Sequence, residues 1–292
     1  MDQPVYIISD LHLGCGDARD NFAHGDRERE LLWLLRRVEV EKARLFILGD
    51  LFDFWQSNVF DVIDYRWSLL NRLWELMANT PHGCVYIPGN HDCDIRHCAT
   101  REMIEHPFFQ HCLHAPHTVE IGDKSVFMLH GHEADPWNAG DRPGAARALT
   151  IMSGLVEDAV GGPYLPGGAA VDAALSGMGE WLLKVWALLA RLRTGKSIQV
   201  RALTPRQCGK QRRSLYQTYE AVYPERADIV IGGHTHRAGR YKGKRQGYWY
   251  FNSGSWAEGR NDVLRITPEP FRVEQFYCRG GALHYVEMEV LG

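Results

Sequence analysis

Five apolar runs in this chain are each followed, within a few residues, by aspartate, asparagine or histidine. The runs lead into Asp10-Leu11-His12, Gly49-Asp50, Gly89-Asn90-His91-Asp92, His130-Gly131-His132 and Gly232-Gly233-His234-Thr235-His236. Carboxylate and amide oxygens and imidazole nitrogens are the donors that suit Mn²⁺, Fe and Zn²⁺. Any one of these residues could be an ordinary turn residue. Their repetition at five places predicts a metal site.

The apolar runs themselves predict the strands that position these donors. The clearest is 45–48, which reaches Gly49 and Asp50 directly. Short apolar runs that end in a turn are typical of strands buried on both faces of an α/β sheet, and such sheets place ligands at the carboxyl ends of their strands. A leucine stripe within 26–38 predicts a helix that crosses over between the first two parallel strands, and a second helix is predicted from Val62 to Met77.

Downstream of His236 the chain has further strand signals separated by turns. The predicted strands span 247–252, 263–266, 271–277 and 283–290. We expect them to form much of a second sheet.

The order of the motifs resembles the calcineurin-like metallophosphoesterases. In sequence order they read Asp-x-His, Gly-Asp-x-x-Asp, Gly-Asn-His-Asp, His-Gly-His and Gly-His-x-His, from Asp10 to His236. The resemblance implies an α/β fold, a four-layer αββα sandwich of two mixed sheets with the metal site along one edge. We expect one domain over 1–292, with a helical lid inserted at about 140–222, because the segment between His132 and His234 is too long for a loop.

The resemblance also implies a ligand set for two divalent cations. The first would be held by Asp10, His12, Asp50 and His236, and the second by Asp50, Asn90, His130 and His234. Asp50 would bridge the two. Manganese is the expected metal, with Fe and Zn²⁺ as alternatives. A hydroxide between two such cations is a nucleophile at neutral pH for displacement at phosphorus.

Three residues beside these ligands are candidates for direct roles in catalysis. In the superfamily, a histidine at the position of His91 faces the substrate phosphate, where it can offset charge or protonate the leaving oxygen. We expect Asp92 to orient His91 and Asp53 to be a further supporting carboxylate. Asp53 could equally be an acidic residue at a helix N-terminus. His132, two residues after His130, is either a neighbour of the ligands or part of the wall of the site.

The predicted lid combines an apolar helix with a basic segment. The helix ends near Leu192, and its last part carries Trp181 and Trp186 among aliphatic residues. Between Glu180 and Glu220 the chain has nine lysines and arginines and no acidic residue. A solvated helix face is the ordinary interpretation of a charge run. An anionic membrane surface or a phosphate-bearing amphiphile is the alternative that the neighbouring apolar helix favours.

Composition and charge limit the class of protein. The chain has 292 residues, of which 45% are hydrophobic and 24% charged, as in globular proteins with a substantial core. A net charge of -3 argues against a nucleic-acid partner, because such binding depends on clustered Lys and Arg. Seven cysteines without a regular framework and no recognisable signal peptide predict a cytoplasmic protein, with peripheral attachment to the inner face of the cell membrane as a further expectation.

The motifs leave three functions to compare. The Ser9-Asp10-Leu11-His12 opening, Phe52-Asp53-Phe54-Trp55 and Asn252-Ser253-Gly254-Ser255-Trp256 resemble the UDP-2,3-diacylglucosamine hydrolases of lipid A biosynthesis. That resemblance implies hydrolysis of the pyrophosphate of a lipid-linked nucleotide. The best-known members of this branch have arginine at the position of His91, whereas most phosphoesterases have histidine. A phosphodiesterase or phosphomonoesterase acting on a nucleotide or another soluble phosphate is therefore the alternative. A non-catalytic scaffold is the third reading, and the complete ligand set argues against it.

Overall fold

A computed structural model describes most of the chain outside one long central segment. It describes residues 3–17, 19–79, 83–96, 104–112, 114–134, 227–242, 249–257 and 260–291. The predicted lid at about 140–222, with its apolar helix and basic residues, lies outside these ranges. None of the helices in the described part of the chain has the length and apolar character that crossing a bilayer requires.

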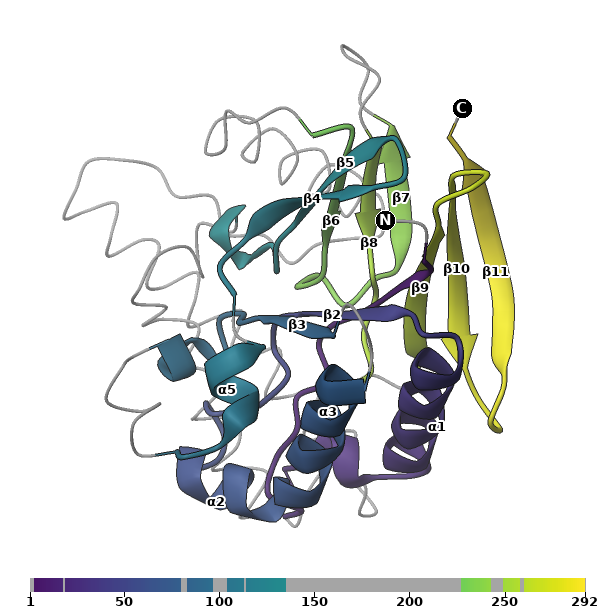
Figure 1. Cartoon of the computed structure of the whole chain (residues 1–292). Coiled ribbons are helices and arrows are strands. Elements are labelled where there is room, and N and C mark those ends of the chain that lie inside the picture. The colour runs from purple at the N-terminus through teal and green to yellow at the C-terminus, as the bar shows by residue number, and fades with distance from the viewer. Residues whose placement is uncertain are drawn as a thin grey trace, which may run out of the picture.

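Two mixed β-sheets form the centre of the protein (Figure 1). The first has the order β11-β10-β9-β1-β2-β3, and the second has the order β4-β5-β6-β8-β7. Strands of the first sheet are β1 (Val5–Ile8), β2 (Arg44–Leu48), β3 (Cys84–Ile87), β9 (Asn261–Thr267), β10 (Arg272–Cys278) and β11 (Leu283–Val290). Strands of the second are β4 (His117–Ile121), β5 (Lys124–Met128), β6 (Ile229–Gly232), β7 (Gly239–Lys242) and β8 (Trp249–Asn252). The predicted α/β class with two mixed sheets is confirmed.

The central strands are buried on both faces, which explains their continuous apolar sequence. In β1, Val5 and Ile7 point into an apolar cluster shared with the second sheet, while Tyr6 and Ile8 point into a cluster shared with the helices. The cluster between the sheets also contains residues of β5, β6 and β8, so the two sheets pack face to face. The carboxyl ends of β1, β2 and β3 are held in line by their parallel pairing.

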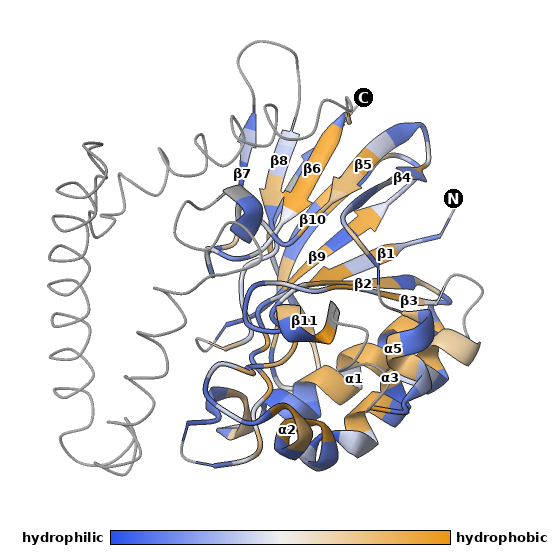
Figure 2. Cartoon of the chain, turned by 90° about the vertical axis from the view of Figure 1, so that its left-hand side faces the viewer, coloured by the Kyte–Doolittle hydropathy of each residue, from blue (hydrophilic) through white to orange (hydrophobic). Residues whose placement is uncertain are grey.

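The α-helices of the described residues cover the outer face of the first sheet (Figures 1 and 2). They are α1 (Arg27–Val40), α2 (Val59–Tyr65), α3 (Trp67–Asn79) and α5 (Pro107–His111). Helix α1 buries Leu31, Leu34, Leu35 and Val38, a helical spacing that turns one side of it to the sheet. As predicted, α1 connects two parallel strands. One helical layer and the two sheets, three of the four predicted layers, therefore lie within the described residues.

Two expectations about the elements were wrong. The helix expected from Val62 to Met77 is divided into α2 and α3 at Arg66, whose buried guanidinium bonds to the Gly14 carbonyl, Asp20 and Glu28. The strands β9, β10 and β11 extend the first sheet rather than the second, because β9 pairs antiparallel with the free side of β1. Of the predicted C-terminal strands, only β8 belongs to the second sheet.

Candidate metal centre

The metal-site candidates of the sequence converge at one edge of the sandwich. Asp10 and His12 follow β1, Asp50 follows β2, and Asn90 follows β3. His130 follows β5 of the second sheet, and His234 and His236 follow β6. Because the strands that carry them are parallel within each sheet, their carboxyl ends meet at the same edge.

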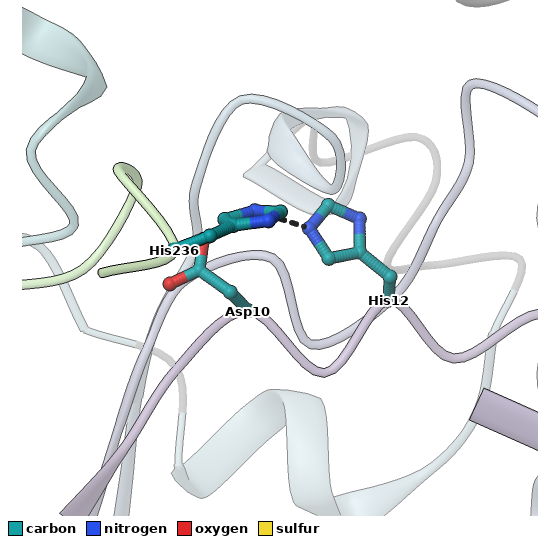
Figure 3. A group of neighbouring side chains, drawn as sticks. All are labelled: Asp10, His12 and His236. Atoms are coloured by element: carbon teal, nitrogen blue, oxygen red, sulfur yellow. Dashed lines mark hydrogen bonds and ion pairs between the residues drawn. The ribbon is translucent and has the colours of Figure 1, made fainter. Parts of the chain in front are cut away.

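One group of donors consists of Asp10, His12 and His236, whose candidate ligand atoms all lie within 4.8 Å of one another. The Nε2 atoms of His12 and His236 are 3.2 Å apart, and His236 Nε2 lies 3.3 Å from Asp10 Oδ1 (Figure 3). The three side chains come from two sheets and point toward one another.

A second group consists of Asp50, His130 and His234, again with ligand atoms within 4.8 Å of one another. His130 Nε2 lies 3.2 Å from Asp50 Oδ2 and 3.2 Å from Asn90 Oδ1. The same Asp50 Oδ2 lies 3.8 Å from His12 Nε2 of the first group. One carboxylate oxygen therefore reaches histidines of both groups.

The tautomer of His130 is set by the backbone. Its Nδ1 lies 2.7 Å from the carbonyl oxygen of Leu48, which can only accept a hydrogen bond, so Nδ1 carries the proton. Nε2 is directed at Asp50 and Asn90. Burial lowers the pKa of His130, but the charge of Asp50 outweighs burial and raises this pKa to about 10, so without a cation Nε2 also carries a proton, which a bound cation would replace. Metal-bound histidines are held in this way, with the second ring nitrogen bonded to a backbone carbonyl or carboxylate.

These residues fit a divalent cation. The facing nitrogens of His12 and His236 can share only one proton, whereas a cation satisfies both together with the nearby carboxylates. Asp10 and Asp50 are almost fully buried. Burial raises the pKa of Asp50, but the surrounding histidines, His130 first, outweigh it and hold this pKa well below its usual value. The mixed set of nitrogen and oxygen donors is one that Mn²⁺, Fe and Zn²⁺ accept.

Backbone strain is concentrated at these donors. Among the described residues other than glycine, six have a positive φ, and five of the six belong to the two groups. These five are Asp10 (53°), His12 (51°), Asp50 (48°), His234 (66°) and His236 (53°). Left-handed backbone is unfavourable for such residues and is typical of functional sites, where the surrounding structure enforces it.

Glycine at two positions allows the donors to approach one another. A Cβ on Gly89 would lie 2.2 Å from Asp50 Oδ1, and a Cβ on Gly49 would lie 2.2 Å from His130 Nδ1. Both distances are far below van der Waals contact. Glycine therefore precedes Asp50 and Asn90 for a steric reason, because a side chain at either position would overlap a neighbouring donor, as well as for its role in the turn.

A serine network that the sequence analysis did not assign holds Asp10. The Ser9 hydroxyl donates to Asp10 Oδ2 and lies 2.7 Å from the Ser253 hydroxyl. Ser255 Oγ and the Trp256 backbone N–H both donate to the Asp10 carbonyl, at 3.2 and 3.0 Å. The sequence did carry a signal for this network, because residues 253–256 follow the apolar strand β8 just as the other motifs follow their strands.

His91 lies beside both groups, with its ring held by Asp53. His91 Nδ1 is 3.0 Å from Asp53 Oδ1, and the His91 backbone N–H donates to Asp50 Oδ1 at 2.9 Å. Candidate ligand atoms of His12, Asp50 and His91 also lie within 4.8 Å of one another. Burial lowers the pKa of His91, but the charges of Asp53 and Asp50 outweigh burial and raise it, which favours an imidazolium facing the site.

The expected partner of His91 was Asp92, and the structure corrects this assignment. The Asp92 carboxylate accepts hydrogen bonds from the backbone N–H groups of Gly89, Leu51 and Phe52, at 2.6, 2.7 and 3.3 Å. It thus joins the turn after β3 to the turn after β2, and Asp53 contacts the His91 ring instead. Burial first, and then the charge of Asp50, raise the pKa of Asp92.

His132 lies in the wall of the site outside the donor groups. Its ring centroid is 5.4 Å from that of His130 and 6.5 Å from that of His234. The side chain is buried, and burial lowers its pKa to about 4, so the imidazole is neutral.

Comparisons with known proteins identify the family. The calcineurin-like phosphoesterase family model matches residues 3–238. A UDP-2,3-diacylglucosamine hydrolase of Porphyromonas gingivalis is 29% identical over 133 residues, which are 46% of this chain and 47% of that protein, so the match spans about half the length of this relative.

The chain is also similar to solved structures of Vps29 proteins and of an archaeal phosphodiesterase. A single mutant of Vps29 from Entamoeba histolytica has a TM-score of 0.45 at 13% identity, covering 99% of this chain and 100% of its own. The archaeal phosphodiesterase has a TM-score of 0.41 at 14% identity, covering 94% and 99%. The family of this chain is assigned from the match to the family model. The groups of histidine and aspartate side chains that could hold a metal ion agree with that family. This chain belongs to the calcineurin-like phosphoesterase family, whose members are metal-dependent phosphoesterases.

Proposed function

We propose that the protein is a two-metal hydrolase of phosphoric esters or anhydrides in which Asp50 contacts both cations. The supporting observation is that Asp50 Oδ2 lies 3.2 Å from His130 Nε2 and 3.8 Å from His12 Nε2. Asp10, His12, Asp50 and His236 would hold one cation, and Asp50, Asn90, His130 and His234 the other. We propose Mn²⁺ as the metal, with Fe and Zn²⁺ as alternatives.

The chain's own residues supply positioning and a proton. When bound, the cations would supply Lewis acidity and a water molecule of lowered pKa. His91, protonated beside Asp53, would donate a hydrogen bond to the phosphate and then its proton to the leaving oxygen. In the overall hydrolysis the water oxygen ends on phosphorus, and a proton from that water restores His91. Asp53 keeps the His91 proton donor directed at the site through its 3.0 Å contact with Nδ1.

We propose the pyrophosphate of UDP-2,3-diacylglucosamine as the scissile group. Support comes from the name of the Porphyromonas gingivalis relative, from the motifs around Phe52–Trp55 and Asn252–Trp256, and from the apolar and basic composition of 181–213. The insertion at about 140–222 would be a lid of a single domain and would meet acyl chains or an anionic membrane surface from the cytoplasmic side. His91 favours the second candidate, a phosphodiesterase or phosphomonoesterase on a soluble phosphate.

A substrate comparison separates the two candidates. Purified protein loaded with Mn²⁺ is incubated with UDP-2,3-diacylglucosamine and with bis(p-nitrophenyl) phosphate. Release of UMP and diacylglucosamine phosphate supports the lipid proposal. Turnover of the small diester alone would refute that proposal and leave the phosphoesterase chemistry in place.

The shared role of Asp50 is tested by Asp50→Ala. Loss of the shared ligand should weaken the binding of both cations and lower kcat by several orders of magnitude, measured by metal analysis and turnover. Asp123→Asn is a control, because Asp123 is exposed and its carboxylate lies 3.1 Å from Lys124 in the turn before β5. If Asp50→Ala kept its metal and its turnover, the bridging role would be wrong.

A further inference from the structure

The indole of Trp55 lies flat against the imidazole of His91. Their ring centroids are 3.9 Å apart and their planes differ by 23°. Trp55 is only 4% exposed, so this contact is made inside the protein. Trp55 belongs to the turn that follows Asp53, and His91 belongs to the turn after β3, so the stack joins two motif segments.

The hydrogen bond that His91 donates to Asp53 does not by itself fix the plane of the His91 ring. A bond to Nδ1 constrains one atom and its direction, and it leaves the ring able to turn about the Nδ1···Oδ1 line. The face of Trp55 removes that freedom, because an offset stack has a preferred interplanar geometry. The edge contact with His12, at 4.6 Å between centroids and 84° between planes, limits the ring from a second direction.

The two residues are also coupled through one oxygen atom. Asp53 Oδ1, which contacts His91 Nδ1, accepts the backbone N–H of Trp55 at 3.2 Å. The backbone of Trp55 is thus held by the same carboxylate that holds the imidazole. The Trp55 Nε1–H is buried and has no hydrogen-bond acceptor in the part of the chain that the structure describes, so the indole meets the site through its ring face.

We propose that Trp55 is a positioning residue for His91, and that its indole face fixes the imidazole plane so that Nε2 is directed at the leaving oxygen of the phosphate substrate. This inference rests on the proposed function, in which His91 is the proton donor. Trp55 itself touches neither the donor groups nor the substrate in this role.

The kinetic test uses a double-mutant cycle on the Mn²⁺-loaded enzyme with bis(p-nitrophenyl) phosphate. Trp55→Leu removes the aromatic face and should lower kcat about tenfold to hundredfold with little change in KM, as expected for a misdirected catalytic group. Trp55→Phe keeps a face and should restore kcat to within about threefold of wild type. In a His91→Ala background, Trp55→Leu should cause no further loss, because the residue through which it acts is absent.

Trp74→Leu is the matched control. Trp74 stacks on His111 at 5.1 Å and 29°, on α3 and α5 away from the metal centre, so its loss removes a comparable pair and should leave kcat unchanged. Three results would overturn the proposal: an unchanged kcat in Trp55→Leu, an equal loss in the His91→Ala background, or a Trp55→Phe variant as slow as Trp55→Leu. The last would show that an aromatic face at this position is not enough to position the imidazole.

A second readout does not depend on activity. In ¹H–¹³C spectra of protein with labelled histidine, the His91 ring protons should be shifted upfield by the indole, and Trp55→Leu should remove this shift. If the wild type hydrolysed no phosphoester, the proposed function would fail while these spectra still reported on the stack. Unchanged His91 signals in Trp55→Leu would refute the stack itself.

Discussion

Replacing Gly49 with alanine tests whether the metal centre depends on close packing between the motif turns. Gly49 connects β2 to Asp50 with φ +80°, and an added Cβ would lie 2.2 Å from His130 Nδ1 and 2.3 Å from its Cγ. Ordinary contacts of a Cβ begin at 3.4 Å, so the His130 ring has to move by more than about 1 Å. Such a shift conflicts with the 2.7 Å bond from Nδ1 to the Leu48 carbonyl and with the 3.2 Å approach of Nε2 to Asp50.

The expected loss can be estimated from these contacts. Disturbing the group that orients a histidine ligand typically lowers metal affinity by about 10- to 100-fold, or about 1.4–2.8 kcal/mol. The left-handed backbone adds about 1–2 kcal/mol of strain to the folded state. Gly49→Ala should therefore lower both the affinity for Mn²⁺ and the free energy of unfolding.

Gly25→Ala separates strain from steric overlap. Gly25 has a similar φ of +74°, but nothing lies within 4 Å of its added Cβ. In this variant backbone strain should lower the free energy of unfolding by about 1–2 kcal/mol, measured in urea titrations. The affinity for Mn²⁺ should stay that of the wild type. Isothermal titration with Mn²⁺ measures the affinity of each protein. The reasoning is refuted if Gly49→Ala binds Mn²⁺ like the wild type, or if Gly25→Ala loses as much affinity.

Two further predictions concern stability. Arg66→Met leaves the buried Asp20 carboxylate without its cation and should lower the free energy of unfolding by about 3–5 kcal/mol in urea titrations. Arg29→Met, at an exposed pair with Asp26, should cost less than about 1 kcal/mol, and equal effects would contradict the prediction. Burial raises the pKa of Asp262 to about 6 from 3.8, so between these values the folded chain keeps a proton that the unfolded chain releases. The contribution of Asp262 to stability should therefore fall by about 3 kcal/mol as pH rises from about 4 to 6, measured as the difference between the wild type and Asp262→Asn in urea titrations. A difference that does not change with pH would show the pKa of Asp262 to be normal.

The sequence by itself predicted which residues converge at the candidate metal centre. Each donor follows an apolar run within a few residues, and short apolar runs that end in a turn are recognisable in the sequence. Parallel strands share an edge for their carboxyl ends, so donors after β1, β2 and β3 had to lie together once the runs were assigned. The crossover helix α1 followed from the same local pattern of leucines.

Only the tertiary structure decided which side chains and strands contact one another. Asp53 and Asp92 are both close to His91 in the motifs, but the direction of each carboxylate depends on the geometry of the turns, in which Asp50 has a φ of 48°. The structure directs Asp53 to the ring and Asp92 to backbone N–H groups. It also joins β9 to β1 and brings Trp55 against His91. Local patterns specify how a segment is built and which side it buries. The choice among distant partners depends on the competition between all long-range contacts, and no single segment encodes it.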